Sequence, residues 1–147
     1  MRKISNEPFF SRVEAEIAEG RSVRFRLKGW SMFPLLRDGR DEVVLCPCTS
    51  EELRPMDVVL FRYNGGHVLH RIIRREGTLL RIRGDGSFVA REQCMVTDVV
   101  GKVHFVIRPS GRVLSVNGWR WRLSGLLWSK TGIFRNPLLR ILRHLAE

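Results

Sequence analysis

The chain has 147 residues, which is enough for one domain with a substantial core and too short for two domains of ordinary size. Its hydrophobic fraction of 44% and charged fraction of 28% exclude a chain that is disordered throughout. No apolar run approaches the roughly 20 residues that span a bilayer, and the acidic residues in MRKISNEPFFSRVEAE, residues 1–16, exclude a signal peptide. We therefore expect a cytoplasmic protein that could reach a membrane only peripherally, from its surface.

The net charge of +11 is concentrated near the C-terminus, where residues 109–147 carry seven Arg or Lys and one acid. This excess favours contact with phosphates, anionic lipid or an acidic polypeptide, without choosing among them. The three cysteines, Cys46, Cys48 and Cys94, are an odd number and do not suggest a disulfide framework. Cys46-Pro-Cys48 lacks the second pair that a zinc site needs, so we expect no metal and no cofactor.

The N-terminal segment predicts a short amphipathic helix that ends at Gly20, with Phe9, Phe10, Val13 and Ile17 as its apolar residues. From Ser22 to about Ser115 the pattern changes to short apolar or alternating runs, each bounded by turn-forming residues, as in successive strands. The runs are SVRFRL (22–27), DEVVLC (41–46), DVVLFRY (57–63), HVLHRII (67–73), TLLRIR (78–83) and VVGKVHFVI (99–107).

Asn64-Gly65-Gly66 separates two of these runs and predicts a hairpin. In the first run, alternation places Val23, Phe25 and Leu27 on one face and Arg24 and Arg26 on the other. Because no helix separates the strands, we predict a mainly β fold, a coiled antiparallel sheet or partial barrel.

After Asn117 the composition changes again, and helices are expected. Asn136-Pro137 can open a final helix with one apolar face, and a similar stripe precedes Gly132. The first face comprises Leu138, Ile141, Leu142 and Leu145, and the second Trp119, Leu123, Leu126 and Leu127. We divide the chain into residues 1–117, a β domain that includes the N-terminal helix, and residues 118–147, a basic helical tail rich in Trp and Leu.

One loop, KGWSMFPLLRDG at residues 28–39, can present a nucleophile. Gly29 leaves backbone N–H groups open to a substrate, and Pro34 stiffens the exit from the loop. Ser31 would also need a base, and the candidates are His67, His70, His104 and His144. His67 and His70 are three apart on one predicted strand and face opposite sides, so only one could meet Ser31. The spacing does not choose between them, and a serine in such a loop can also be an ordinary turn residue.

The order of GWSMFPLLRDGRDEVV, LRPMDVVLFR, HVLHRII, RIRGDGS and VVGKV resembles that of type I signal peptidases and of the self-cleaving repressor proteases that share their fold. The resemblance covers residues 27 to about 104, some two thirds of the chain. It implies that residues 1–117 form a coiled, mostly β catalytic domain of the signal peptidase type. It also implies that Ser31, in a G-x-S-M-x-P loop, is the nucleophile, with Gly29 and Met32 supporting the loop and the oxyanion.

Where bacterial members carry a lysine base, this chain has His70-Arg71-Ile72-Ile73, which resembles the archaeal and endoplasmic-reticulum branch that uses Ser and His. Histidine suits this position because its reference pKa is about 6.5, whereas that of lysine is about 10.4 and would have to fall. The resemblance therefore implies His70 as the base. GDGS at 84–87 matches a family box that makes Asp85 the first choice for the third catalytic residue; Asp98, the second, could equally be a turn residue.

The resemblance also has departures. Gly29 stands where some relatives have a serine, Met56 stands where a glycine is usual, and the chain is expected to lack an N-terminal membrane anchor. The first functional hypothesis is nevertheless a serine endopeptidase of the signal peptidase type, which the resemblance implies cleaves a peptide or protein substrate after small side chains.

The alternative is a catalytically inactive binding module whose basic tail contacts nucleic acid or an anionic membrane surface. In that case Trp119, Trp121 and Trp128, interleaved with arginines, could stack on bases or lie at a lipid interface; equally, they could be core residues. Self-cleavage, as in the repressor relatives, is a third hypothesis. We expect a peptide or protein partner, peripheral membrane contact through residues 118–147, and no nucleic acid partner.

Overall fold

The computed structural model describes residues 7–26, 32, 35–37, 39–86, 92–129 and 135–146. Within these ranges, three α-helices accompany the strands: α1 (Glu7–Ala18), α2 (Trp119–Ser129) and α3 (Arg135–Ala146). The strands are β1 (Val23–Arg26), β2 (Glu42–Cys46), β3 (Val58–Tyr63), β4 (Gly66–Glu76), β5 (Leu79–Arg83), β6 (Glu92–Met95), β7 (Val99–Ile107) and β8 (Val113–Ser115). Two short 3₁₀ turns, η1 (Ser50–Glu52) and η2 (Val96–Asp98), precede β3 and β7.

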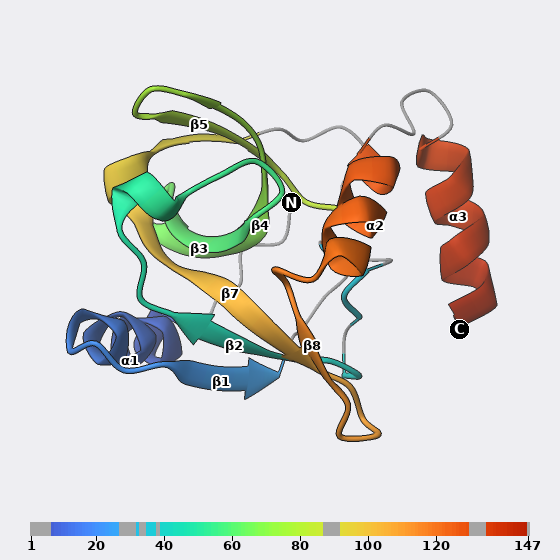
Figure 1. Cartoon of the computed structure of the whole chain (residues 1–147), viewed down its shortest axis with the longest axis horizontal. Helices are drawn as coiled ribbons and strands as arrows, with labels where there is room; N and C mark the ends of the chain where they lie inside the picture. Colours follow the sequence, from blue (N-terminus) through green and yellow to red (C-terminus); the bar gives the residue numbers. More distant parts are fainter. Residues whose placement is uncertain are drawn as a thin grey trace.

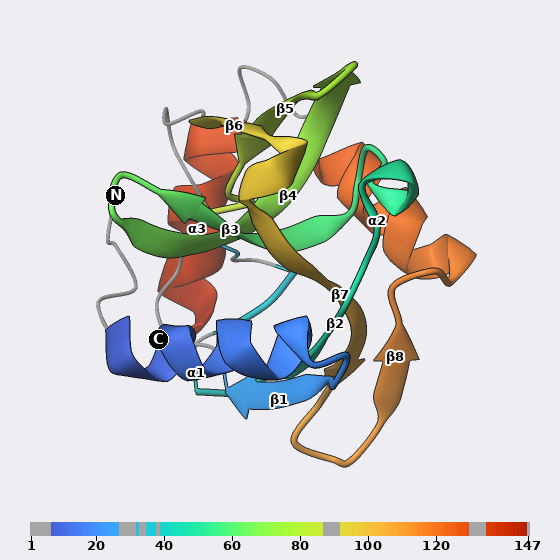
Figure 2. The same cartoon turned by 90° about the vertical axis from the view of Figure 1, so that its left-hand side faces the viewer.

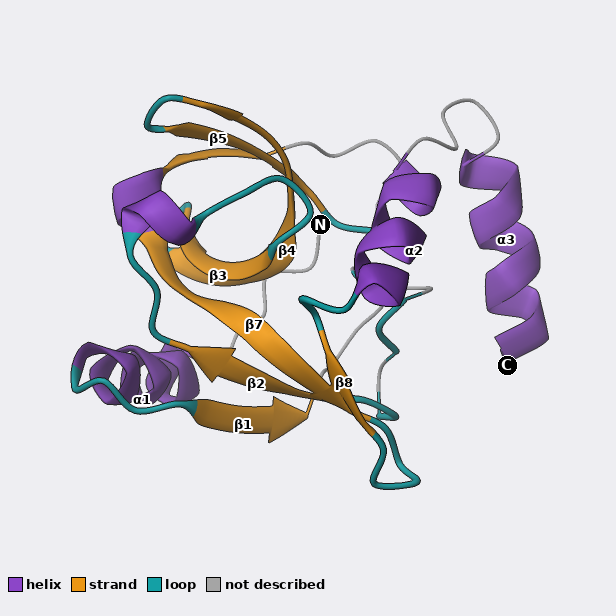
Figure 3. Ribbon diagram, in the orientation of Figure 1, coloured by secondary structure: helices purple, strands orange, loops and turns teal. Residues whose placement is uncertain are grey.

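The strands form one antiparallel sheet in the order β1-β2-β7-β3-β4-β5-β6, with β8 paired to β7. The sheet does not close; β3, β4 and β5 coil around one end of it, and α1 lies alongside β1 at the other (Figures 1 and 2). The helices lie at the periphery of this β body (Figure 3). The predicted mainly β, antiparallel fold is therefore confirmed. The six predicted runs correspond to six of the strands, whereas β6 and β8 were not singled out.

The β3–β4 hairpin follows its sequence signal closely. Asn64 and Gly65 form its two-residue loop with φ values of 49° and 75°. Two successive positive φ values are those of a type I′ turn, whose twist matches that of the strands on either side. This turn fixes the register of β4 and hence the faces on which its two histidines lie.

Alternation along β3 and β4 divides the interior into two clusters. Leu60 and Leu69 face a cluster formed with α1, β2 and β7, whereas Phe61 and Val68 face a second cluster inside the coiled end of the sheet. Each of the two strands is therefore buried on both faces, as their nearly continuous apolar sequences require.

The two tail helices bury only part of the apolar stripes seen in the sequence, α2 against the sheet and α3 against α2. In α2 the buried side chains are Trp121 and Trp128, and the predicted stripe of Leu123, Leu126 and Leu127 is exposed. In α3, Leu139 is buried against Trp128, while Leu138, Ile141 and Leu145 of the predicted face are exposed. Leu142 of the predicted α3 face packs partly against the same cluster. The indoles, rather than the leucine spacing, therefore determine how α2 packs.

Asp41, just before β2, joins the segment after the Ser31 loop to the sheet. Its fully buried carboxylate accepts hydrogen bonds from the Arg40 side chain, from Arg108 Nη1 of the residue after β7 at 2.6 Å, and from the Arg37 N–H at 2.9 Å. Burial would raise the pKa of Asp41, but these donors outweigh it and lower the pKa below its usual value.

Replacing Asp41 with asparagine is expected to lower the free energy of unfolding by about 2 kcal/mol at pH 7. Because the folded-state pKa lies below the unfolded value of about 4, the stabilisation is complete above that value. It is lost as the pH falls through the folded pKa. Urea denaturation from pH 7 to pH 2.5 should therefore show a constant difference between the two proteins above about pH 5, which shrinks below pH 4. A difference that does not change over the whole range would contradict this account.

Met56 has a φ of 77°, in the left-handed region that favours glycine. The backbone at this position therefore has a conformation that a methionine side chain disfavours. Met56→Gly is expected to stabilise the protein by about 1 kcal/mol. The control is Asn64→Gly, which should gain less because asparagine tolerates this region. Urea denaturation midpoints measure the stability of both variants. An equal gain in stability in the two would contradict the explanation that the backbone at Met56 is strained.

Candidate active site

Ser31 and Gly29, the predicted nucleophile and loop support, lie outside the described residues. Met32 is described and is 3% exposed in the cluster beneath α1 and β2. Its carbonyl accepts a hydrogen bond from the Leu36 N–H at 3.0 Å, and Leu36 is buried in the same cluster. The residue that follows Ser31 is thus anchored in the core.

The two histidines of β4 lie on opposite faces, as predicted. The ring of His67 stacks on Phe10 of α1, and its Nε2 contacts the carboxylate of Glu14. His70 faces the other cluster, with its ring 6.4 Å from that of Phe61. His67 therefore attaches α1 to the sheet, and His70 is available for a different role inside the coiled end.

The carboxylate beside His70 belongs to Glu92, at the start of β6. The Nδ1 of His70 is 3.2 Å from Oε1 of Glu92, and each residue is only 2% exposed. The register accounts for the contact: Ile72 pairs with Ile82 and Ile82 with Glu92, so these side chains share a face with His70. Sequence reasoning missed Glu92 because a charged residue at an inward position breaks the apolar alternation of a short strand.

The contact between His70 and Glu92 is within ion-pair distance but is not aligned as a hydrogen bond. Within the described part of the chain, neither His70 Nδ1 nor either carboxylate oxygen of Glu92 has another hydrogen-bond partner. Buried polar groups are rarely left in this state, and hydrogen bonds at catalytic sites are often poorly aligned before a ligand binds. A small rotation of the imidazole would align the pair.

Asp85, the predicted third catalytic residue, has a different partner. Its Oδ1 and Oδ2 accept hydrogen bonds from Nε and Nη2 of Arg71 at 2.9 and 2.8 Å, and Arg71 is fully buried. Arg71 is the neighbour of His70 on β4 and projects from the opposite face. The structure therefore brings Glu92, rather than Asp85, to His70, because the planar guanidinium provides two parallel donors that match both Asp85 oxygens.

The Arg71–Asp85 pair also forms the surface on which α2 packs. Trp128 Nε1 donates to the Asp85 carbonyl at 2.8 Å, and the Arg71 guanidinium lies over the Trp121 ring. Gly125 allows this approach, since a Cβ there would lie 2.6 Å from Arg71 Nη1. These contacts bury Trp121 and Trp128, so neither indole is exposed for base stacking.

Asp98, the second candidate, is a turn residue. It ends η2, directly before β7, and its Oδ2 accepts a hydrogen bond from the Met95 N–H at 2.9 Å. The alternative that Asp98 is a turn residue is thus confirmed.

Cys46, Cys48 and Cys94 are free thiols. Burial raises the pKa of Cys48 to about 11 and that of Cys94 to about 12. Among the described residues, no group of His, Cys, Asp and Glu side chains is arranged to hold a metal ion. In the same part of the chain, no helix is long and apolar enough to cross a membrane.

Comparison with known proteins does not place the chain in a family: no protein-family model matches it, and no curated protein sequence is significantly similar. What the site does must therefore be inferred from its own residues and their contacts.

Proposed function

We propose that the chain is a serine endopeptidase, similar to signal peptidases, that cleaves a peptide or protein substrate by a Ser-His mechanism. The observation that carries the proposal is the buried pair of His70 and Glu92, 3.2 Å apart. It involves the histidine at the position where the resembling family has its base. A buried imidazole with a carboxylate on one nitrogen and the other nitrogen left to accept a proton is the arrangement that general-base catalysis needs.

In this mechanism Ser31 Oγ attacks the scissile carbonyl carbon while His70 Nε2 takes the hydroxyl proton. The tetrahedral oxyanion then collapses to an acyl-enzyme, and the imidazolium gives its proton to the leaving amine. Water, activated by the same imidazole, releases the acyl group. Glu92 accepts a hydrogen bond from Nδ1–H, which keeps the lone pair on Nε2, and its charge stabilises the imidazolium. In this scheme Glu92 replaces Asp85 as the orienting carboxylate.

A serine-directed fluorophosphonate or penem probe tests the proposal. We expect the purified protein to gain the mass of one acyl or phosphonyl group, and fragmentation should place it on Ser31. Ser31→Ala should not be labelled, whereas Cys94→Ser, which removes a buried thiol, should be labelled as the wild type is. Undiminished labelling of Ser31→Ala would refute the proposal.

A second function, contact with an anionic membrane surface, is supported by the exposed faces of α2 and α3. Leu127 is 62% exposed and Leu145 is 77% exposed, in a segment with a net charge of +6. Apolar side chains beside excess positive charge suit the interface of an anionic bilayer. Nucleic acid is less well supported, since the buried indoles of Trp121 and Trp128 cannot stack on bases and Arg122 pairs with Asp57.

Vesicle sedimentation tests this contact. We expect binding to vesicles of phosphatidylcholine with phosphatidylglycerol, weaker binding at high salt, and a loss in the Leu127→Glu/Leu145→Glu double variant. Met95→Glu, at an exposed apolar residue outside the tail, is the control and should bind as the wild type does. Equal binding by the double variant, or binding to single-stranded nucleic acid alone, would contradict a lipid contact.

A further inference from the structure

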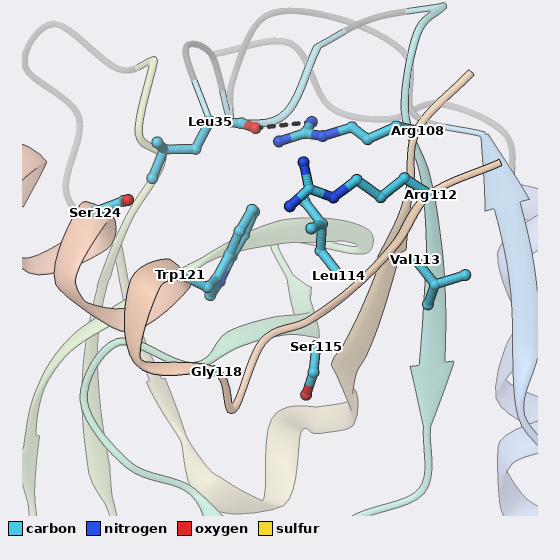
Figure 4. A pocket seen from close by; sticks show the side chains of 9 residues that line it. All are labelled: Leu35, Arg108, Arg112, Val113, Leu114, Ser115, Gly118, Trp121 and Ser124. Atoms are coloured by element: carbon cyan, nitrogen blue, oxygen red, sulfur yellow. Dashed lines mark hydrogen bonds between the residues drawn. The ribbon is translucent and has the colours of Figure 1, made fainter. Parts of the chain in front are cut away.

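A pocket of about 520 Å³ lies between the turn that joins β7 to β8 and the first turns of α2. Figure 4 shows Arg108 and Arg112 entering it from one side and the Trp121 ring facing them from the other. Leu35 closes one end, and Ser115 lies at the opposite end. The pocket therefore combines a cationic wall with an aromatic wall.

The cationic wall carries more positive charge than the acid beside it can neutralise. Arg108 donates to Asp41 Oδ2 at 2.6 Å and to the Leu35 carbonyl at 3.3 Å, but Asp41 also accepts two hydrogen bonds from Arg40. Arg112 is exposed, and its guanidinium has no ion pair or hydrogen bond within the described residues. Arg108 shares its acid with Arg40, and Arg112 adds a further positive charge to the same wall, so an anion that contacts both guanidinium groups would be stabilised there.

The opposite wall indicates what kind of anion fits. Trp121, which is 8% exposed, and Leu114 also line the pocket and give it apolar surface. A carboxylate on a short aliphatic stem matches both walls, because its stem packs on the ring and its oxygens accept the parallel N–H donors of arginine. The volume suits an amino-acid side chain or a chain terminus better than a large cofactor.

The pocket is also close to the proposed nucleophile along the chain. Leu35, which lines it, is four positions after Ser31, and four residues span at most about 14 Å. An extended peptide covers that distance in about four residues. A substrate whose scissile bond is at Ser31 could therefore place a residue in the pocket.

We infer that this pocket binds a carboxylate of the peptide substrate, held by Arg108 and Arg112, no more than about four residues from the scissile bond. The inference rests on the proposed peptidase function for the identity of the ligand. It makes an acidic residue near the cleavage site, or a free C-terminus at that distance, a determinant of substrate choice. The carboxylate would add to binding and not to the chemical step, so it should act on KM.

The test uses acetylated dodecapeptides with a central Ala-Ala pair and a glutamate at successive positions three to five residues on either side. Each has a glutamine counterpart, and both are C-terminally amidated. A third set has a free C-terminus and no acidic side chain, which separates a terminal carboxylate from a side-chain one. Binding is measured with Ser31→Ala, so that no cleavage occurs, and cleavage is measured with the wild type.

We expect the best glutamate peptide, or the best free-terminus peptide, to bind about tenfold more tightly than its neutral counterpart. KM should change in the same proportion with kcat unchanged. Arg112→Gln should abolish this preference, whereas Arg12→Gln, which removes the same charge from the exposed side of α1, should keep it. Cleavage with equal KM for acidic and neutral peptides, no preferential binding of any carboxylate, or equal preference in Arg112→Gln would overturn the inference. If carboxylate binding depends on Arg112 but no peptide is cleaved, the pocket stands and the peptidase proposal fails.

Discussion

Replacing His70 with glutamine is expected to slow the acylation of Ser31 by about 10²- to 10⁴-fold, the range that general-base assistance contributes. Glutamine is close to histidine in size and keeps polar atoms near Glu92, but it cannot take a proton from a hydroxyl. The change should therefore lower kcat and leave KM close to its wild-type value. Stopped-flow acylation by the fluorophosphonate or penem probe measures the effect directly.

His67→Gln is the matched control, because it changes the same residue type on the same strand but on the opposite face. It removes the contact with Glu14 and the ring stacked on Phe10. It should lower stability by loosening α1 and leave the acylation rate of the folded protein unchanged. If both variants lose acylation equally, His70 has no special role as the base.

Glu92 is assigned as a positioning residue, and its test separates that role from simple packing. Glu92→Gln should lower kcat less than His70→Gln does, without a change in KM, and Glu92→Asp should restore part of the loss. A purely structural pair would instead change stability and leave kcat per folded molecule unaltered. That outcome would remove Glu92 from the mechanism.

Breaking the Arg71–Asp85 pair is expected to have the largest effect on stability. Both side chains are buried, so removing one leaves the other charged and without its main partner. Arg71→Met or Asp85→Asn should each lower the free energy of unfolding by about 3–5 kcal/mol. The Arg71→Met/Asp85→Asn double variant should lose less than the sum of these two single changes, since it leaves no buried charge unpaired.

Urea denaturation measures these changes, with Arg74→Met as a control because Arg74 pairs with Glu76 at the exposed surface. Additive losses in the double variant would contradict a coupled pair.

Asp85→Asn also tests the prediction that Asp85 is the third catalytic residue. If Asp85 orients the base, acylation per folded molecule should fall as far as in Glu92→Gln; we expect it to stay near the wild-type rate.

Much of the fold could be predicted because its signals are local. The Asn64-Gly65 turn required positive φ at two positions, and alternation along the runs identified six strands. The opposite faces of His67 and His70 followed from the strand period alone. These are properties of neighbouring residues, and tertiary context did not change them.

The contacts that could not be predicted join distant segments. Sequence order could not show whether the Asp85 carboxylate would meet His70 or its neighbour Arg71, since one residue along β4 reverses the face. Nor could it show that Glu92 faces inward, which depends on the register of β5 with β6. The leucine spacing in α2 also did not indicate which face is buried. That face is set by Trp121 and Trp128, which pack on the Arg71–Asp85 pair, and by Gly125, which allows Arg71 to approach the helix.

The most direct test of the central claim is a crystal structure of the protein acylated at Ser31 by a penem. We predict that His70 Nε2 lies about 2.6–3.2 Å from Ser31 Oγ, with Glu92 hydrogen-bonded to Nδ1 and Asp85 still paired with Arg71. The account would be contradicted if the imidazole of His70 were turned away from Ser31, or if another side chain occupied the position of the base.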